Sequence, residues 1–401
     1  MASPDDALQR IDALIQVAMR LAASAPSGRI ALAKLASALE ERWIPRPWRT
    51  SVWPELERAR AAAVAEPMAP KAVERALREA WGASPSDELD ELDTEPVAVT
   101  PTSQVHRAVL DGGDVAVKLL RPGLAGVRQD LALLEGLAGP LASAFPGIDP
   151  QAILREVRER VLDELDLEHE AETMRRFRRG LRNHPQLVVP APATSLARPS
   201  VLVSEWIDGV PLTEAGDRDH DRAAAWLVIF ALGGIRAGLV HADPDPEDVL
   251  EMADGRLAVL DYGATRTVSR QRASLGLQVA EAFAAGDGAA LGRALQELGA
   301  LPADQGPKAL ELARIALGKL GEPGASRLDS DAVVAVGRRA AGLPDTATEL
   351  AMQGGLPPED LWPLRGAALA FGTVARLGAD GDWLELTVRA LREGWQATPP
   401  D

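Results

Sequence analysis

The sequence predicts an α+β protein with a small lobe that contains β-strands and a larger, mostly helical lobe. Hydrophobic residues make up 46% of the chain, and most of them are Ala, Leu and Val, a mixture that favours helices. From residue 97 the hydrophobic spacing changes to that of strands, and from about residue 270 it is helical to the end. A helical extension at the N-terminus completes this prediction.

Residues 1–90 are expected to form that extension. The stretches IDALIQVAMRLAA, IALAKLASALEERW and KAVERALREAWG place apolar residues at helical spacing. The acidic segment SPSDELDELDTEP, residues 84–96, breaks the pattern and marks a boundary. Two strands are then predicted in PVAVTPTSQVHRAVLDGGDVAVKLL, around a turn at Asp111-Gly112-Gly113, because Asp-Gly is a strong hairpin signal.

The remaining segments complete two lobes, residues 91–203 and residues 204–401. PQAILREVRERVLDELDLEHEAETMRRFRRGL is predicted to be a long charged helical region, and VVPAPATSLARPSVLVSEWIDG two strands and an exit loop. AAAWLVIFALGGIRAG is too short to span a membrane and is expected to be a buried helix. RLAVLDYGA is expected to be a short strand that ends in a polar turn.

The composition excludes several classes of function. A net charge of -16 argues against nucleic-acid binding, which needs basic patches. The chain has no cysteine, and its five histidines lack the spacing of a zinc site. The N-terminus lacks the pattern of a signal peptide, so a cytoplasmic protein with at most peripheral membrane contact is expected.

The residues that could carry chemistry follow the order of a protein kinase. Lys118 lies on a predicted strand and Glu170 on the charged helix, and H-A-D with Asp243 precedes L-D-Y-G. In this plan Lys118 holds the α- and β-phosphates of ATP, Glu170 holds Lys118, and Asp243 orients the attacking hydroxyl or water. Asp261 and Asp248 offer the carboxylate oxygens that Mg²⁺ prefers.

Two further segments are candidates for nucleotide contacts. The backbone of the segment after the last strand of the small lobe would meet adenine, through the Glu205 carbonyl and the Ile207 amide. By resemblance to the kinase plan, the loop VAVTPTSQVHRA stands where ordinary kinases have a Gly-rich loop over the phosphates, although it has no glycine to let amides approach them closely. Its candidate residues are Thr100, Thr102, Ser103 and Gln104.

Several motifs together resemble the UbiB (AarF-domain) family of atypical protein-kinase-like proteins. They are RPGL after Lys118, ELDxxxEA from Glu164, EWIDG, HADPxP and LDYGATR, and the resemblance covers roughly residues 25–395. It implies a bilobal kinase-like fold with the helical extension over the active site. The family's K-x-G-Q motif would fall on the segment from Lys34 to Ser37, and its E-x-D motif on Glu164 and Asp166.

The resemblance also implies a function. ATP and Mg²⁺ are the expected ligands, and ATPase activity in support of isoprenoid quinone or lipid metabolism is the expected activity. A lipid-like or phenolic small molecule and a partner biosynthetic enzyme would accompany that role.

The sequence departs from the family pattern in three places. The extension motif keeps Lys34 without its Gly and Gln, and Tyr262 replaces a Phe. The loop HADPHPGN has become HADPDPED, so that Asp248 replaces the metal-binding Asn. The added negative charge near the triphosphate is expected to raise the demand for Mg²⁺ or to weaken ATP binding.

Three functions remain open at this point. The first is a Mg-dependent ATPase or phosphotransferase with a small lipid-like acceptor, and the second is a pseudokinase whose ATP state controls docking to a partner enzyme or membrane surface. The third is an antibiotic-kinase type of phosphotransferase, which the ELDxxxEA helix and the extension argue against. A calcium loop at residues 243–248 is disfavoured, because Asp248 stands where such a loop has Gly. The basic run RRFRRGLR fits a charged helix end better than a lipid contact.

Overall fold

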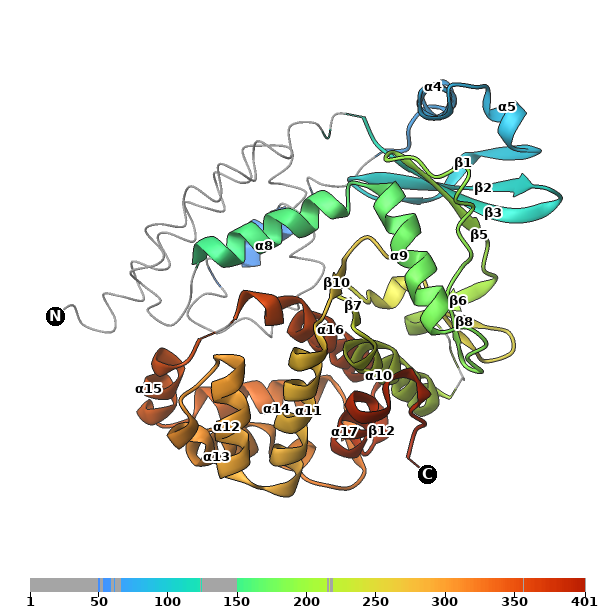
Figure 1. Cartoon of the computed structure of the whole chain (residues 1–401). Coiled ribbons are helices and arrows are strands. Elements are labelled where there is room, and N and C mark those ends of the chain that lie inside the picture. The colour runs from blue at the N-terminus through green and yellow to red at the C-terminus, as the bar shows by residue number, and fades with distance from the viewer. Residues whose placement is uncertain are drawn as a thin grey trace.

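The computed structural model describes residues 50, 53–58, 61, 66–122, 124, 150–214, 216, 219–355 and 357–400. Lys34 lies outside the described residues. In Figure 1 a four-stranded sheet lies above a large helical lobe, and α9 (Leu167–Gly180) runs between them. The predicted α+β class is confirmed.

The sheet of the small lobe has the order β1-β2-β3-β5 and is antiparallel throughout. Its strands are β1 (Glu91–Val99), β2 (Ser103–Leu110), β3 (Gly113–Leu120) and β5 (Val201–Glu205). The predicted hairpin turn is confirmed, since Leu110 pairs with Gly113. Asp111 and Gly112 both have a left-handed backbone, with φ of 53° and 74°, as a two-residue type I′ turn requires.

The expectation of two strands in this region is wrong, because the sheet contains a third consecutive strand. β1 begins at Glu91, inside the acidic segment read as a boundary, and α5 (Pro85–Glu88) lies in the same segment. β1 is an edge strand with mostly exposed residues, so its acidic side chains remain in water. Pro96 sits at an irregularity of the β1–β2 register, where an edge strand tolerates it.

One face of this sheet is covered by α4 (Pro70–Trp81), which confirms the helix predicted for KAVERALREAWG. Pro at the first helical position favours the start of this helix, and Gly82, with φ of 73°, ends it. Val73 and Leu77 are buried and belong to the same hydrophobic cluster as Val117 and Leu119 of β3. Lys118, between these two residues in sequence, consequently points to the opposite face of the sheet.

The long charged segment forms two helices, α8 (Pro150–Asp163) and α9, separated at residues 164–166. The Asp166 side chain accepts hydrogen bonds from the Glu168 and His169 amides, both at 3.1 Å, and so caps α9. Further along α9, Met174 and Phe177 are buried in the core of the large lobe.

The large lobe also contains short sheets. One has the order β4-β9-β8-β6, with β4 (Leu187–Val188), β6 (Gly209–Pro211), β8 (Val249–Met252) and β9 (Leu257–Val259). Two others are pairs: β7 (Leu239–His241) with β10 (Thr265–Thr267), and β11 (Ser326–Leu328) with β12 (Ala379–Gly381).

Helices make up the rest of this lobe. The α-helices are α10 (His220–Ala237), α11 (Arg270–Ala285), α12 (Gly288–Leu298), α13 (Gly306–Leu317), α14 (Ser330–Ala341), α15 (Asp345–Gln353), α16 (Leu361–Leu377) and α17 (Trp383–Glu393). Single 3₁₀ turns lie at Leu212–Glu214, Pro246–Asp248, Ala303–Gln305, Gly318–Gly321, Pro358–Asp360 and Gly394–Gln396.

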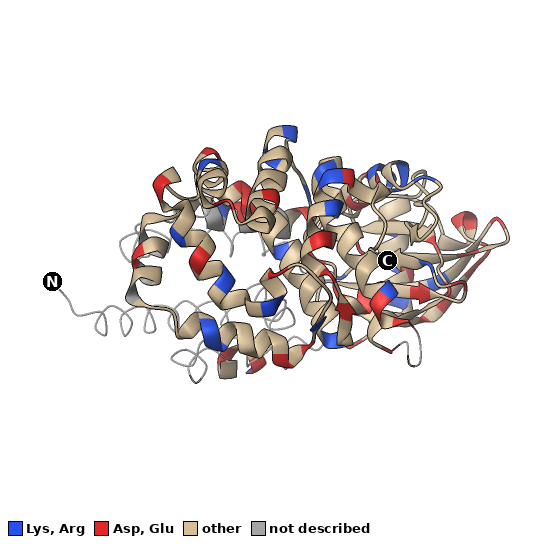
Figure 2. Ribbon diagram, turned by 90° about the horizontal axis from the view of Figure 1, so that it is seen from below, with Lys and Arg blue, Asp and Glu red and all other residues tan. Residues whose placement is uncertain are grey.

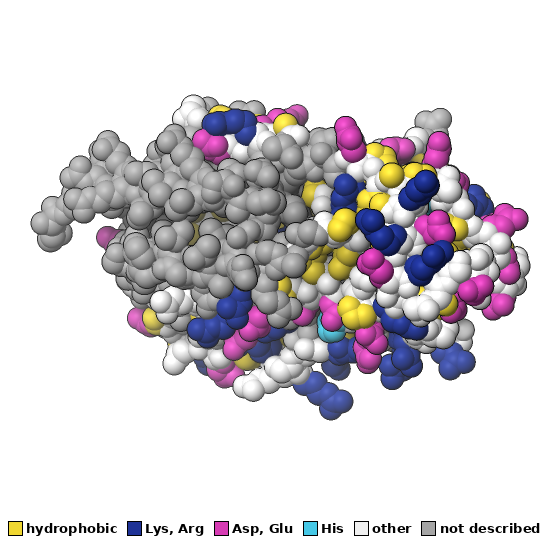
Figure 3. Space-filling view, turned by 90° about the horizontal axis from the view of Figure 1, so that it is seen from above, with side chains coloured by type: hydrophobic (Ala, Val, Ile, Leu, Met, Phe, Trp, Pro, Cys, Tyr) yellow, Lys and Arg dark blue, Asp and Glu magenta, His cyan; other side chains and the backbone are white. Residues whose placement is uncertain are grey.

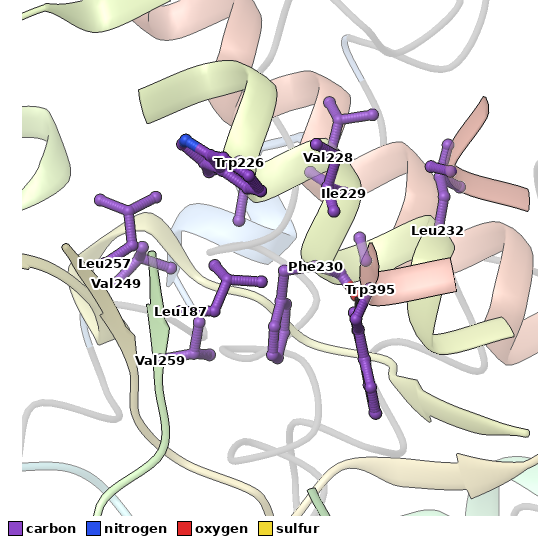
Figure 4. Packing of buried hydrophobic residues seen from close by; sticks show 14 of the residues in the cluster. Leu187, Trp226, Val228, Ile229, Phe230, Leu232, Val249, Leu257, Val259 and Trp395 are labelled. Atoms are coloured by element: carbon purple, nitrogen blue, oxygen red, sulfur yellow. Dashed lines mark hydrogen bonds between the residues drawn. The ribbon is translucent and has the colours of Figure 1, made fainter. Parts of the chain in front are cut away.

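α10 is the centre of the hydrophobic core, which confirms the buried helix predicted for AAAWLVIFALGGIRAG. Figure 4 shows Phe230 of α10 next to Trp395, with Leu187, Val249 and Val259 on the other side. Trp395 also donates its indole N–H to the Phe230 carbonyl at 2.9 Å. None of the described helices is long and apolar enough to cross a membrane.

Candidate active site

Lys118 lies at the centre of an ion-pair network between the lobes. Its Nζ is 3.0 and 2.9 Å from the two carboxylate oxygens of Glu170 and 3.1 Å from Oδ1 of Asp261. Burial alone would lower the pKa of Lys118, but the charges of Asp261 and Glu170 outweigh burial and raise it above its usual value. Lys118 is therefore an ammonium ion, and the predicted pairing with Glu170 is present.

Glu170 is held from two sides. The cap at Asp166 fixes the first turn of α9, and Glu170 lies one turn later with a side chain that is 2% exposed. Its Oε1 also accepts the Tyr262 backbone N–H at 3.2 Å. The buried carboxylate thus connects β3, α9 and the L-D-Y-G segment.

Asp261 has an unusual backbone for a residue other than glycine. Its φ of 45° is in the left-handed region, which costs conformational energy and is common at functional sites. The Gly263 N–H donates to Asp261 Oδ1 at 3.2 Å. A Cβ at Gly263 would lie 3.4 Å from Glu164 Cα, so the E-x-D motif packs directly against this loop.

The His241 ring contacts the same loop. Its Nε2 is 2.6 Å from the Asp261 carbonyl oxygen, to which it donates, and its ring packs against Tyr262 with 5.2 Å between ring centroids. Burial lowers the pKa of His241, although Asp261 and Asp243 oppose this effect. A neutral imidazole in this position has a structural role.

The loop between β7 and β8 carries four more carboxylates, at Asp243, Asp245, Glu247 and Asp248. The Asp248 backbone carbonyl accepts the Leu260 N–H at 2.8 Å, which fixes Asp248 beside the Asp261 segment. Removal from water, followed by the charges of Asp261 and Asp245, raises the pKa of Asp248 well above its usual value. A cation bound between these groups would relieve the repulsion.

The donor set fits Mg²⁺ with an open coordination shell. Among the described residues no three metal-ligating side chains are already gathered around one point. Mg²⁺ commonly takes one or two protein carboxylates and completes its octahedron with water and phosphate oxygens. Asp261 and Asp248 would hold it in that manner, while Lys118 would hold the phosphates.

Arg365 is a site residue that the sequence analysis misses. Its Nη2 is 2.8 Å from Oδ1 of Asp243, and the two residues are 122 positions apart. Arg365 lies on α16, which packs against β7 because Gly366 has no side chain: a Cβ there would collide with the His241 carbonyl oxygen. A single Arg-Gly pair in a helical segment gives no signal of this contact.

The segment after β5 is suited to contact a flat base through its backbone. The Glu205 N–H donates to the Ala191 carbonyl at 2.8 Å and the Trp206 N–H to the Asp114 carbonyl at 3.2 Å. Ile207 is a buried residue, and its N–H has no acceptor among the described residues. Because backbone N–H groups in protein interiors nearly always have a partner, this donor is a candidate for a ligand contact.

The predicted phosphate loop is bonded to itself. Thr100 Oγ1 accepts the amide N–H groups of Thr102 and Ser103 at 3.3 and 2.9 Å. Gln104 is buried, accepts the Met68 N–H at 2.9 Å and lies 2.6 Å from His106 Nε2. None of these contacts reaches Lys118, so a phosphate role for the loop stays a prediction.

Charge on the described surface is mixed in sign. In the ribbon of Figure 2 both basic and acidic residues are spread over the helices, and on the described part of the face in Figure 3 Lys and Arg side chains lie beside Asp and Glu. On the described part of that face, the charged side chains therefore do not form the single-sign patch that is typical of a nucleic-acid surface.

The fold and the Lys118–Glu170–Asp261 network define a kinase-like protein. Residues 61–294 match the model of the ABC1 atypical kinase-like domain, which is more than half of the chain. The chain belongs to this family, whose members include the UbiB and AarF-domain proteins, and the resemblance found in the motifs is confirmed.

Relatives and a solved structure agree with this assignment. The probable protein kinase UbiB of Marinobacter nauticus is 33% identical over 208 residues, 48% of this chain and 38% of the relative. Protein ACTIVITY OF BC1 COMPLEX KINASE 1, chloroplastic, of Arabidopsis thaliana is 32% identical over 197 residues, 46% of this chain and 29% of the relative. The chain thus spans less than half the length of these two relatives.

The structure of a complex of Rv3197 with erythromycin from Mycobacterium tuberculosis aligns with a TM-score of 0.60 at 22% identity, over 89% of both chains. This likeness supports the bilobal kinase-like fold.

Proposed function

We propose that this protein binds ATP with Mg²⁺ and transfers the γ-phosphoryl group to water or to a hydroxyl of a small molecule. The observation that carries the proposal is the three-way contact of Lys118 with Glu170 and Asp261. In kinases the ammonium pairs with a helix glutamate and the neighbouring aspartate binds the metal. A protein that needed Lys118 only for stability would gain little from this costly arrangement of partly buried charges.

Each residue has a chemical task in this proposal. Lys118 neutralises phosphate oxygens, and Glu170 keeps the ammonium in place. Asp261 and Asp248 hold Mg²⁺, which supplies positive charge at the phosphates when bound. Asp243 orients the attacking oxygen and takes its proton, and the Ile207 N–H with the Glu205 carbonyl receives adenine.

The acceptor is proposed to be a lipid-like or phenolic compound, in a role that supports isoprenoid quinone or lipid metabolism. This part rests on family membership, through relatives such as the probable protein kinase UbiB. A partner biosynthetic enzyme, peripheral contact with a membrane and a cytoplasmic location belong to the same proposal. Glu164, packed against Gly263, would couple the N-terminal extension to the metal loop.

A catalytically weak pseudokinase is the second candidate. Two observations favour it: the loop amides of Thr102 and Ser103 are already bonded to Thr100, and Asp248 adds a carboxylate to the metal site. In this case nucleotide binding would control docking to a partner. Phosphate release from ATP by wild type no faster than by Asp243→Asn would favour this candidate over the first.

The first experiment is Mg-dependent ATP binding by wild type and Asp261→Ala, measured by titration calorimetry. We expect affinity to fall at least about 10-fold, because a metal ligand and a partner of Lys118 are lost together. Asp304→Ala, at an exposed position in the 3₁₀ turn Ala303–Gln305 of the large lobe, is the control and should bind as wild type does. Unchanged binding by Asp261→Ala would refute the proposed nucleotide site.

A further inference from the structure

The loop between β7 and β8 brings no positive charge of its own. The stretch HADPDPED contains no Lys or Arg, and the negative charges of Asp261, Asp245 and Asp243 all act on its Asp248. Lys118, the cation on the opposite side of the site, is already in contact with Glu170 and Asp261. ATP adds further negative charge at this place, so a positive side chain beside Lys118 and Mg²⁺ would stabilise the transferred phosphoryl group.

Arg365 is a cation that α16 places against this loop. One of its nitrogens contacts Oδ1 of Asp243 at 2.8 Å, and its guanidinium also lies 5.6 Å from the centroid of Trp362. Within the described residues its remaining N–H groups have no acceptor, and the side chain is 27% exposed. A guanidinium with free, forked donors is suited to bind phosphate oxygens in a bidentate manner.

The backbone fixes this placement. Gly366 allows α16 to touch the His241 carbonyl oxygen, and in Figure 1 α16 lies beside β7 and β10. The position of Arg365 next to Asp243 therefore follows from the close packing of α16 on β7.

We propose that Arg365 binds the γ-phosphoryl oxygens of ATP and exchanges them for Asp243 when the nucleotide is absent. This inference rests on the proposed function. In the transfer step, the acceptor oxygen bonds to the γ-phosphorus while the bond from that phosphorus to the β–γ bridging oxygen breaks, and the electron pair leaves with ADP. The acceptor proton passes to Asp243, whose carboxylate oxygen is free of Arg365 once the guanidinium has moved to the phosphate.

The test compares ATP with ADP. Arg365→Gln should weaken Mg-ATP binding about 10- to 100-fold and leave Mg-ADP binding within about 2-fold of wild type, because ADP lacks the γ-phosphate. Arg365→Lys keeps the positive charge without the forked donors, so its affinity for Mg-ATP should lie between those of wild type and Arg365→Gln. Arg376→Gln, at an exposed position three turns further along α16, is the matched control and should change neither affinity.

The outcomes separate the inference from the function on which it rests. Equal weakening of ATP and ADP binding by Arg365→Gln, or no weakening of either, would overturn the role at the γ-phosphate while leaving the nucleotide site intact. A wild-type protein that binds neither nucleotide would overturn the proposed function and the inference together. Thermal melting shows whether each variant folds. If Arg365→Gln does not fold, the same comparison of Mg-ATP with Mg-ADP binding is made with Arg365→Lys.

Discussion

Asp248 is a partly buried carboxylate among other carboxylates, and this position gives its protonation a measurable effect on stability. Removal from water and the charges of Asp261 and Asp245 raise its pKa in the folded state. The folded protein therefore binds this proton more tightly than the unfolded chain does. Stability from this group is present at low pH and is lost as the pH rises from about 4, the ordinary pKa of Asp, through the folded-state pKa.

Asp248→Asn should remove that loss. At pH 8, with a chelator present, we expect the variant to be more stable than wild type by about 1 kcal/mol, and near pH 4 the two should be equal. Urea unfolding at both pH values measures the difference. Asp304→Asn, an exposed aspartate outside the site, is the control. A gain at pH 4 as large as that at pH 8 would show that the carboxylate's charge is not the cause.

At the scale of single elements, one side chain fixes both the start of α9 and the position of Glu170 on it. Asp166 accepts two amide N–H groups at the first turn, and Glu170 follows in the next turn. Asp166→Ala should cost about 1 kcal/mol of stability through the lost cap and should also weaken Mg-ATP binding, because Glu170 shifts.

Asp287→Ala removes a comparable cap from α12, where Asp287 accepts the Ala290 N–H at 2.9 Å. It should cost a similar free energy of unfolding and leave Mg-ATP binding unchanged. Nucleotide titrations and urea unfolding on both variants make the comparison. If the two variants bind ATP equally well, the cap has no role in positioning Glu170.

Local patterns of sequence predict elements well where the elements obey them. Asp111-Gly112 predicts its hairpin because only a few residues accept two left-handed conformations in succession. The apolar stretch of α10 predicts burial on every side. β1 escapes prediction because an exposed edge strand needs no alternation of apolar residues, so its acids resemble those of a linker.

At the scale of the whole molecule, the site is part predictable and part not. Lys118, Glu170 and Asp261 are identified by the spacing of kinase motifs, and the structure brings them together. Arg365 and the buried contacts of Gln104 arise from tertiary packing between segments far apart in sequence. Such contacts leave no periodic or motif signal, so a single sequence does not reveal them.

The packing of α16 on the strand β7 that precedes the HADPDPED loop gives a prediction about the entire lobe. Gly366→Ala places a methyl group against the His241 carbonyl oxygen, so the helix has to move away. We expect a loss of about 1–3 kcal/mol in the free energy of unfolding. Gly276→Ala is the control, since a Cβ there meets nothing within 4 Å, and it should be neutral or stabilising by up to about 1 kcal/mol.

The same displacement should uncouple Arg365 from the nucleotide. In the Gly366→Ala background, Arg365→Gln should weaken Mg-ATP binding much less than it does in wild type, because residues that act through one contact are not additive. Titration of the two single variants and the double variant gives this coupling. Additive losses would mean that Arg365 reaches its partner without the close approach of α16, and that the glycine serves packing alone.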